Sequence, residues 1–194
     1  MEGNYAQQAL DSSLLAAKII SPVGLILNFI FLFVTVRVKS MHTIINVYLS
    51  NLAVADFLFL LQALISSSTS LSPETDYVLI MIFYSVINAA RSASFCFVTA
   101  IAVERFSAVH HPITFRSSSS KRRAAKICAG LWVLSVVWGV VTSFLIRSYV
   151  ITGYFPAIYT CFIVSSILQL IFYATTFTVT ACLYIYIVIK LCLP

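Results

Sequence analysis

The sequence is poor in charged residues. Only 9% of its 194 residues are Asp, Glu, Lys or Arg, whereas a soluble domain carries about 25%. Hydrophobic residues make up 61%, and the mean hydropathy is +1.01. A single globular core could not bury that much apolar surface, so lipid must be the solvent for most of it. The shortage of charge therefore excludes an ordinary soluble domain.

Motifs for catalysis and for metal binding are also missing. The five cysteines show no CxxC spacing, and no histidine stands at zinc-finger distance from them. HExxH, GxSxG and glycine-rich phosphate loops are absent, as are paired carboxylates within the apolar runs. We therefore expect neither an enzyme nor a transition-metal site. The sequence also lacks an internal repeat and an inverted pair of broken helices, which weighs against a transporter.

The chain does contain five long apolar runs. Each is long enough to cross a bilayer as an α-helix, which takes about 20 residues. Residues 1–13 are polar and lack the basic start and cleavage site of a secretory signal, so we expect them to form an N-terminal tail. These runs predict an all-α, multi-pass transmembrane helix bundle with one transmembrane domain over 14–194. Its spans are expected at 14–38, 43–65, 77–109, 124–146 and 160–191.

The basic residues predict the orientation of the bundle. The net charge is +6, but the cations sit in loops between apolar runs, which indicates membrane topology rather than a nucleic-acid partner. Lys and Arg are retained on the cytoplasmic side, so the N-terminus is expected outside and the C-terminus inside. The residues that define the inner side are Arg37, Lys39, Arg105, Arg116, Lys121, Arg122, Arg123, Lys126 and Lys190.

Polar residues inside the spans are the functional candidates. Asp56 lies in the second run with no cation near it in sequence, and a carboxylate in hydrocarbon costs about 2.5–3.5 kcal/mol on insertion scales. It is expected to face other helices; the alternative is a helix end that reaches water. Asn28, near the middle of the first span, either makes a purely structural bond or belongs to a functional site. Arg91 needs an anion, water or a carbonyl in mid-membrane.

In order along the chain, these residues resemble the rhodopsin-like (class A) G-protein-coupled receptors. The resemblance covers nearly all 194 residues but only the first five of that family's seven helices. Its motifs are the helix-1 Asn at Asn28, LAxAD at Leu52-Ala53-Val54-Ala55-Asp56, the small polar Ser94, the Asp/Glu-Arg-Tyr position at Glu104-Arg105-Phe106 with Pro112 downstream, and the helix-4 Trp at Trp132.

The resemblance implies roles for two groups of residues. Asn28, Asp56 and Ser94 would meet at the centre of the bundle, where the family holds a sodium ion; Asp56 and Ser94 would be its protein ligands, and no other cofactor is expected. Oxygen ligands suit a hard cation. Arg105 would be held by Glu104 when the receptor is inactive and freed to meet the G protein when it is active. The alternative role for Arg105 is a positive-inside charge at a helix end.

Ligand and partners follow from the same resemblance. Ile87 stands at the helix-3 position where amine receptors carry an Asp, so a cationic amine is not expected. Arg91, one turn deeper, could meet an anionic group such as a peptide carboxylate or an acidic metabolite; the alternative is a pairing with Asp56 or another helix. The expected partners are an extracellular ligand (a peptide or anionic small molecule), a heterotrimeric G protein, the lipid bilayer of the plasma membrane and, as a further option, a receptor dimer.

Three departures from the family pattern are visible. No cysteine lies between Ser66 and Phe95, so the usual bridge from the outer end of helix 3 has no partner for Cys161. The usual Pro of helix 5 is absent. Helices 6 and 7 are absent too, for which an incomplete gene model, a truncated splice form and a fragment are the explanations considered. Five helices alone are not expected to couple to a G protein, so the alternative function is a non-signalling protein that pairs with full-length receptors.

Overall fold

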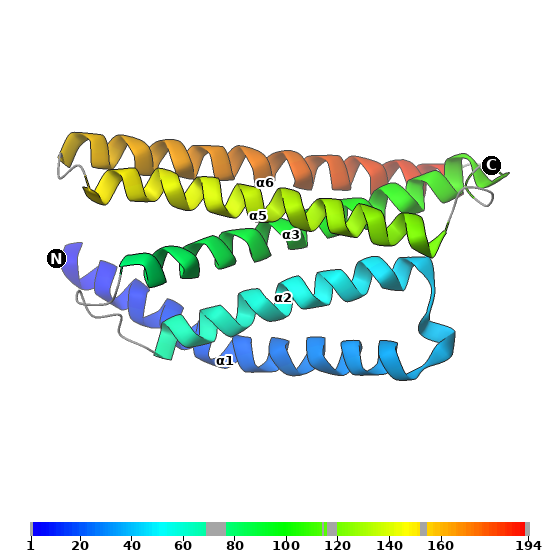
Figure 1. Ribbon diagram of the computed structural model, residues 1–194, viewed down its shortest axis with the longest axis horizontal. Coiled ribbons are helices and arrows are strands. Elements are labelled where there is room, and N and C mark those ends of the chain that lie inside the picture. Colours follow the sequence, from blue (N-terminus) through cyan, green and yellow to red (C-terminus); the bar gives the residue numbers. More distant parts are fainter. Residues whose placement is uncertain (1, 69–76, 114, 116–119, 152–154, 193–194) are drawn as a thin grey trace.

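The described part of the chain is made of long helices without strands (Figure 1). The computed structural model describes residues 2–68, 77–113, 115, 120–151 and 155–192, and the side chains of residues 12, 15, 17–68, 79, 81–113, 115, 120–144 and 163–192. The predicted all-α class is confirmed. The elements are α1 (Glu2–Arg37), the 3-10 turn η1 (Lys39–Met41), α2 (Ile44–Ser68), α3 (Tyr77–His110), α5 (Lys121–Ile151) and α6 (Phe155–Cys192).

Each of the five α-helices contains a segment that is long and apolar enough to cross a membrane. The helices extend beyond some predicted spans: α1 already begins at Glu2, within the residues expected as a tail, although its apolar segment begins at Ala17. Ser120 marks the start of α5, because its side-chain oxygen accepts a hydrogen bond from the backbone N–H of Arg123 at 3.2 Å. Local capping therefore fixes where α5 begins.

Helix α3 is the centre of the bundle. It packs against α2, α5 and α6, while α1 packs against α2 at one side. The helices run along the long axis of the molecule, and the marked N- and C-terminal ends lie at opposite ends of it (Figure 1). A chain that crosses a membrane five times has its two ends on opposite sides, and the arrangement of the helices agrees with this.

Small residues bring α3 and α5 into close contact. Ser135, Gly139 and Ser143 recur every fourth residue and so share one face of α5. A Cβ added to Gly139 would lie only 2.5 Å from the backbone oxygen of Ser85 and 2.8 Å from the backbone nitrogen of Ala89. Membrane helices associate closely through such small residues because lipid gives no hydrophobic driving force between them.

Large apolar side chains cover the outside of the bundle, whereas its interior is built mostly of small and polar ones. Ile171, Phe177 and Leu191 on α6 are all more than half exposed. The buried cluster combines Tyr48 and Phe97 with alanines and Cys128. An apolar surface of this extent is suited to lipid. The chain is thus a multi-pass membrane protein.

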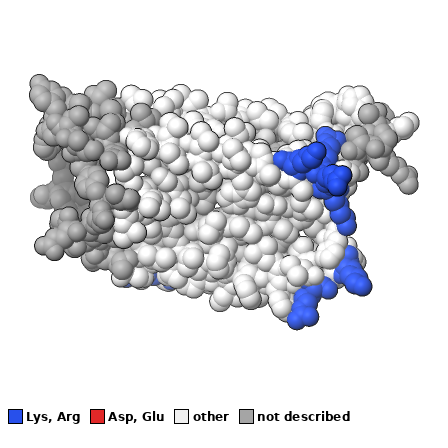
Figure 2. Space-filling model, in the orientation of Figure 1, with Lys and Arg blue, Asp and Glu red and all other residues white. Residues whose placement is uncertain are grey.

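Most of the described Lys and Arg side chains lie at one end of the bundle. Figure 2 shows Lys and Arg concentrated at the end where the C-terminus lies in Figure 1, and the visible face between the two ends is almost free of them. Eight of the nine cations predicted to define the inner side thus share one end, and Arg116 lies outside the described residues. The exposed cations there are Arg37, Lys39, Arg105, Lys121, Arg122, Arg123, Lys126 and Lys190.

Candidate functional site

Asp56 and Ser94 form a polar pair between α2 and α3. The Ser94 hydroxyl donates a hydrogen bond to Asp56 Oδ1 over 2.6 Å, and it also lies 3.2 Å from the backbone oxygen of Ala90. Both side chains are partly buried and line a cavity of about 240 Å³, together with Thr176 and Thr180 of α6. The carboxylate is thus turned toward α3 and α6, as its cost in lipid requires.

Asn28 is not joined to this pair by a hydrogen bond among the described residues. Its amide nitrogen donates instead to the backbone oxygen of Gly24, one turn earlier on α1, over 2.9 Å. The amide oxygen of Asn28 takes no part in this bond. The structure therefore brings together two of the three residues expected in the polar core and ties the third to its own backbone.

Trp132 links α5 to α2. Its indole nitrogen donates a hydrogen bond to Asn51 Oδ1 over 2.9 Å, and Asn51 in turn donates to the backbone oxygen of Val47. The Trp132 ring meets Phe97 of α3 edge-on, with ring centres 5.7 Å apart. An indole N–H that is buried usually finds such a partner. Trp132 thereby contacts α2 and α3 at once and fixes how three helices are rotated.

Glu104 and Arg105 point into different surroundings. Glu104 is only 8% exposed, and its carboxylate accepts a hydrogen bond from the Tyr48 hydroxyl of α2 over 2.8 Å. Arg105 is exposed at the basic end. Among the described residues, no ion pair joins the two. Tyr48 therefore satisfies the carboxylate that the family resemblance assigns to Arg105, and the guanidinium is left accessible.

Phe106 belongs to an aromatic and histidine cluster between the inner ends of α3 and α6. Its ring stacks on His110 with centres 5.4 Å apart and lies 5.1 Å from Tyr186. The Tyr186 hydroxyl is 3.0 Å from His110 Nδ1. Pro112, just beyond α3, is exposed. The cluster holds the inner end of α6 against α3, next to Arg105.

Arg91 lies one turn from Ser94 toward the opposite end of the bundle. Its guanidinium is 5.3 Å from the centre of the Phe59 ring of α2, at cation–π distance. No carboxylate among the described residues pairs with it, and Asp56 is hydrogen-bonded to Ser94. Ile87 is partly buried one turn further along α3. The guanidinium thus contacts α2 through an aromatic ring and also interacts with the Tyr173 side chain of α6.

The family model that matches this chain is that of the 7 transmembrane receptor (rhodopsin family), over residues 27–193. The chain belongs to the rhodopsin family of seven-transmembrane receptors. The predicted membership is therefore confirmed. The receptors it resembles are not enzymes, which agrees with the prediction made from the missing catalytic motifs.

Curated members of the rhodopsin family show how much of a receptor is present here. G-protein coupled receptor 35 of Homo sapiens is 40% identical over 114 residues, which are 59% of this chain and 37% of that receptor. Lysophosphatidic acid receptor 5 of Bos taurus is 32% identical over 132 residues, 66% of this chain and 36% of that receptor. The thyrotropin-releasing hormone receptor of Homo sapiens is 31% identical over 137 residues, which are 69% of this chain and 34% of that receptor. The chain spans about a third of the length of these relatives.

Sequence reasoning missed several residues of this rhodopsin-family site. Tyr48 and Asn51, which bind Glu104 and Trp132, were not predicted to take part. A signal existed for Tyr48: it precedes Asp56 by two helical turns and so shares its inward face. Thr99 of α3 and Thr180 of α6, whose hydroxyls lie 2.9 Å apart, carried no such signal. Cys161, named for the missing disulfide, lies outside the residues whose side chains are described.

Proposed function

We propose that this chain is the ligand- and G-protein-binding part of a G-protein-coupled receptor of the plasma membrane. One observation carries the proposal: α3 bears both the inner-core Ser94, bound to Asp56, and the buried Glu104 followed by exposed Arg105. These positions are ten residues apart, or about 15 Å along the helix. A shift or rotation of α3 or α6 would alter the polar core and the basic end together, which is what a two-state receptor needs.

The basic end is proposed to be cytoplasmic, so that Arg105 and Phe106 face the heterotrimeric G protein. Lys and Arg in short loops favour the cytoplasmic side. In this state Glu104 is held by Tyr48, so Arg105 needs no release from a carboxylate before it can meet a partner. This arrangement differs from the pairing expected from the family resemblance and makes Tyr48 part of the proposed switch.

A sodium ion fits the type of ligand present in the polar core. The Asp56 carboxylate and the Ser94 hydroxyl supply two oxygen ligands beside a cavity, and the hydroxyls of Thr176 and Thr180 line the same cavity. Hard cations prefer oxygen ligands. The ion would neutralise the carboxylate within the membrane and hold α2 against α3. Asn28 could contribute its amide oxygen as a further ligand, because only its amide nitrogen is bonded to its own helix backbone.

The ligand is proposed to carry an anionic group that Arg91 binds. Among the described residues Arg91 meets the Phe59 ring and Tyr173 rather than a carboxylate, so an anionic ligand group could neutralise its charge. Ile87 leaves no acid at the position that would hold a cationic amine. One relative is named as a receptor for lysophosphatidic acid, which carries a phosphate. A guanidinium binds phosphate through paired hydrogen bonds.

Substitution of Arg91 tests the ligand proposal. With lysophosphatidic acid as the probe, Arg91→Gln should weaken the potency of receptor activation by roughly 10- to 100-fold, because a hydrogen bond to a charged group contributes about 1.5–3 kcal/mol. Arg91→Lys keeps the charge and should lose less. The readout is agonist-stimulated nucleotide exchange in membranes carrying the receptor. Unchanged potency in Arg91→Gln would remove Arg91 from the ligand site.

The alternative function, pairing with full-length receptors without signalling, predicts a different result in the same membranes. The chain would then give no exchange with any probe, and its coexpression would lower the surface amount of its partner receptor. The exposed Arg105 at the end of α3 favours the signalling proposal.

A further inference from the structure

Tyr173 of α6 lies against the face of α3 that carries Arg91. Its ring packs on Phe95, one turn from Arg91, with ring centres 4.7 Å apart and planes inclined by 31°. Residues four apart share a helix face, so this contact brings Tyr173 to the Arg91 side of α3. The Tyr173 hydroxyl is buried beside the guanidinium and interacts with it, although the contact falls short of a strict hydrogen-bond geometry.

Phe59 of α2 holds the guanidinium from a second direction. The central carbon of the Arg91 guanidinium lies over the Phe59 ring, 5.3 Å from its centre. A planar cation over an aromatic face is attracted to the ring but can still turn within its own plane. The donors of a guanidinium lie along its edges, so a hydroxyl at one edge resists this turning. Phe59 and Tyr173 together therefore orient Arg91 more completely than either would alone.

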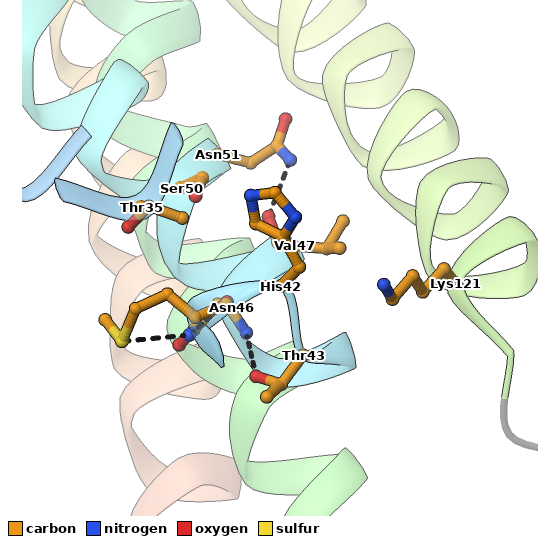
Figure 3. A pocket seen from close by; sticks show the side chains of 9 residues that line it. Thr35, His42, Thr43, Asn46, Val47, Ser50, Asn51 and Lys121 are labelled. Atoms are coloured by element: carbon orange, nitrogen blue, oxygen red, sulfur yellow. Dashed lines mark hydrogen bonds between the residues drawn. The ribbon is translucent and has the colours of Figure 1, made fainter. Parts of the chain in front are cut away.

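Exposed cations at the basic end are held differently. Lys121 extends from α5 toward a cavity of about 380 Å³ (Figure 3), and its ammonium group has no hydrogen bond or ring contact within the described part of the chain. Arg37 lies over Phe33, which belongs to its own helix. Arg91 differs from both because its two aromatic partners come from other helices, one from α2 and one from α6.

We propose that Tyr173 is a positioning residue that sets the orientation of Arg91 toward an anionic ligand. The inference rests on the proposed function, in which Arg91 binds the anionic group of the ligand. With Phe59 at its face and Tyr173 at one edge, the guanidinium keeps a further edge for the ligand. Two parallel N–H groups on that edge match two oxygens of a phosphate or a carboxylate. Tyr173 acts through Arg91 and needs no contact with the ligand, which agrees with its buried hydroxyl.

The role of Tyr173 depends on the shape of the cation. A guanidinium that is already aimed loses less conformational freedom when an oxoanion binds. An ammonium group is a point charge with three rotating donors and has no edge to orient. Tyr173 should therefore matter for an arginine and not for a lysine at the same position. A residue that serves only the packing of α6 against α3 would be indifferent to this difference.

Receptor activation by lysophosphatidic acid tests the role, with nucleotide exchange in membranes as the readout. Tyr173→Phe keeps the ring and removes the hydroxyl, so it should weaken the potency by about 3- to 10-fold, the effect of one hydrogen bond. In an Arg91→Lys background the same change should cost less than about twofold. Tyr184→Phe is the matched control, because it removes a hydroxyl from the same helix where the side chain is 42% exposed. It should stay within about twofold of the wild type.

A measurement without ligand tests the contact itself. Thermal denaturation in micelles should show a melting temperature lower by roughly 1–5 °C for Tyr173→Phe. In an Arg91→Met background no guanidinium donor remains, so Tyr173→Phe should lower the melting temperature by less than about half as much. Equal shifts in the two backgrounds would show that the hydroxyl does not act on Arg91 and would overturn the proposal.

The outcomes separate the positioning role from the ligand proposal. A wild-type receptor that does not respond to lysophosphatidic acid, or unchanged potency in Arg91→Gln, would defeat the ligand proposal and the positioning role with it. Weakened potency in Arg91→Gln, together with equal losses from Tyr173→Phe in the wild-type and Arg91→Lys backgrounds, would defeat the positioning role alone.

Discussion

Alanine in place of Gly139 is expected to destabilise the bundle by about 1–3 kcal/mol, the usual cost of forcing an extra methyl group into a packed interior. The added Cβ would meet the backbone oxygen of Ser85 and the backbone nitrogen of Ala89, which cannot rotate away as a side chain could. Helices α3 and α5 would have to separate. Thermal denaturation in micelles, followed by circular dichroism, should show a melting temperature lower by roughly 3–10 °C.

Gly130 on the same helix provides the matched control. A Cβ added there would have no heavy atom within 4 Å, so Gly130→Ala should be neutral or stabilising by up to about 1 kcal/mol through helix propensity alone. The two substitutions are chemically identical, but only the one at Gly139 is expected to destabilise the bundle. A melting temperature that does not differ between them would show that α3 and α5 do not approach each other at Gly139.

Phenylalanine in place of Tyr48 is the second change with a large expected effect. The ring would keep its buried position, but the Glu104 carboxylate would lose the hydroxyl that donates to it over 2.8 Å. A buried polar group left without its partner costs about 1–3 kcal/mol, and a charged one more. The free energy of unfolding of the purified chain should fall by that amount.

A double-mutant cycle isolates the Tyr48–Glu104 bond from other effects of each substitution. In a Glu104→Met background the carboxylate is gone, so Tyr48→Phe should then cost less than about 0.5 kcal/mol. The difference between the two backgrounds is the coupling energy of the pair. If Tyr48→Phe costs the same in both backgrounds, the hydroxyl does not act through Glu104.

The spans could be predicted from sequence because bilayer crossing depends on length and composition alone. Five apolar runs separated by polar segments, of which two are basic, are enough to give five helices and the gathering of described cations at one end. The helix ends were less predictable. Helix α1 extends back to Glu2 because polar residues can continue a helix beyond the hydrocarbon, where hydropathy carries no signal.

The pairing of Asp56 with Ser94 could be expected only through the family resemblance, because nothing in the chain itself says that these two residues meet. The bonds of Glu104 and Trp132 could not be expected from sequence. Their partners, Tyr48 and Asn51, are 56 and 81 residues away, and finding them requires the rotation of α2 about its axis. That rotation is set by packing against α3, which single-residue patterns do not describe.

Arg91 shows why two alternatives had to stay open. A cation in mid-membrane was expected to meet an anion, water, a carbonyl or a neighbouring helix. It lies over the face of Phe59 on α2, a partner that only the geometry can reveal. The close approach at Gly139 does leave a pattern in the sequence, since Ser135, Gly139 and Ser143 recur every fourth residue. That pattern does not say which helix packs against this face of α5.

Guanine-nucleotide exchange is the measurement that tests the receptor proposal most directly. The chain would be expressed from its own gene, with any sequence beyond residue 194 included, in membranes that contain a heterotrimeric G protein. Exchange should exceed that of empty membranes and should fall to background in Arg105→Ala. Arg122→Ala, which removes another exposed cation at the same end, should retain it. Exchange no higher than in empty membranes, or equal loss in both variants, would contradict the proposal that Arg105 contacts the G protein.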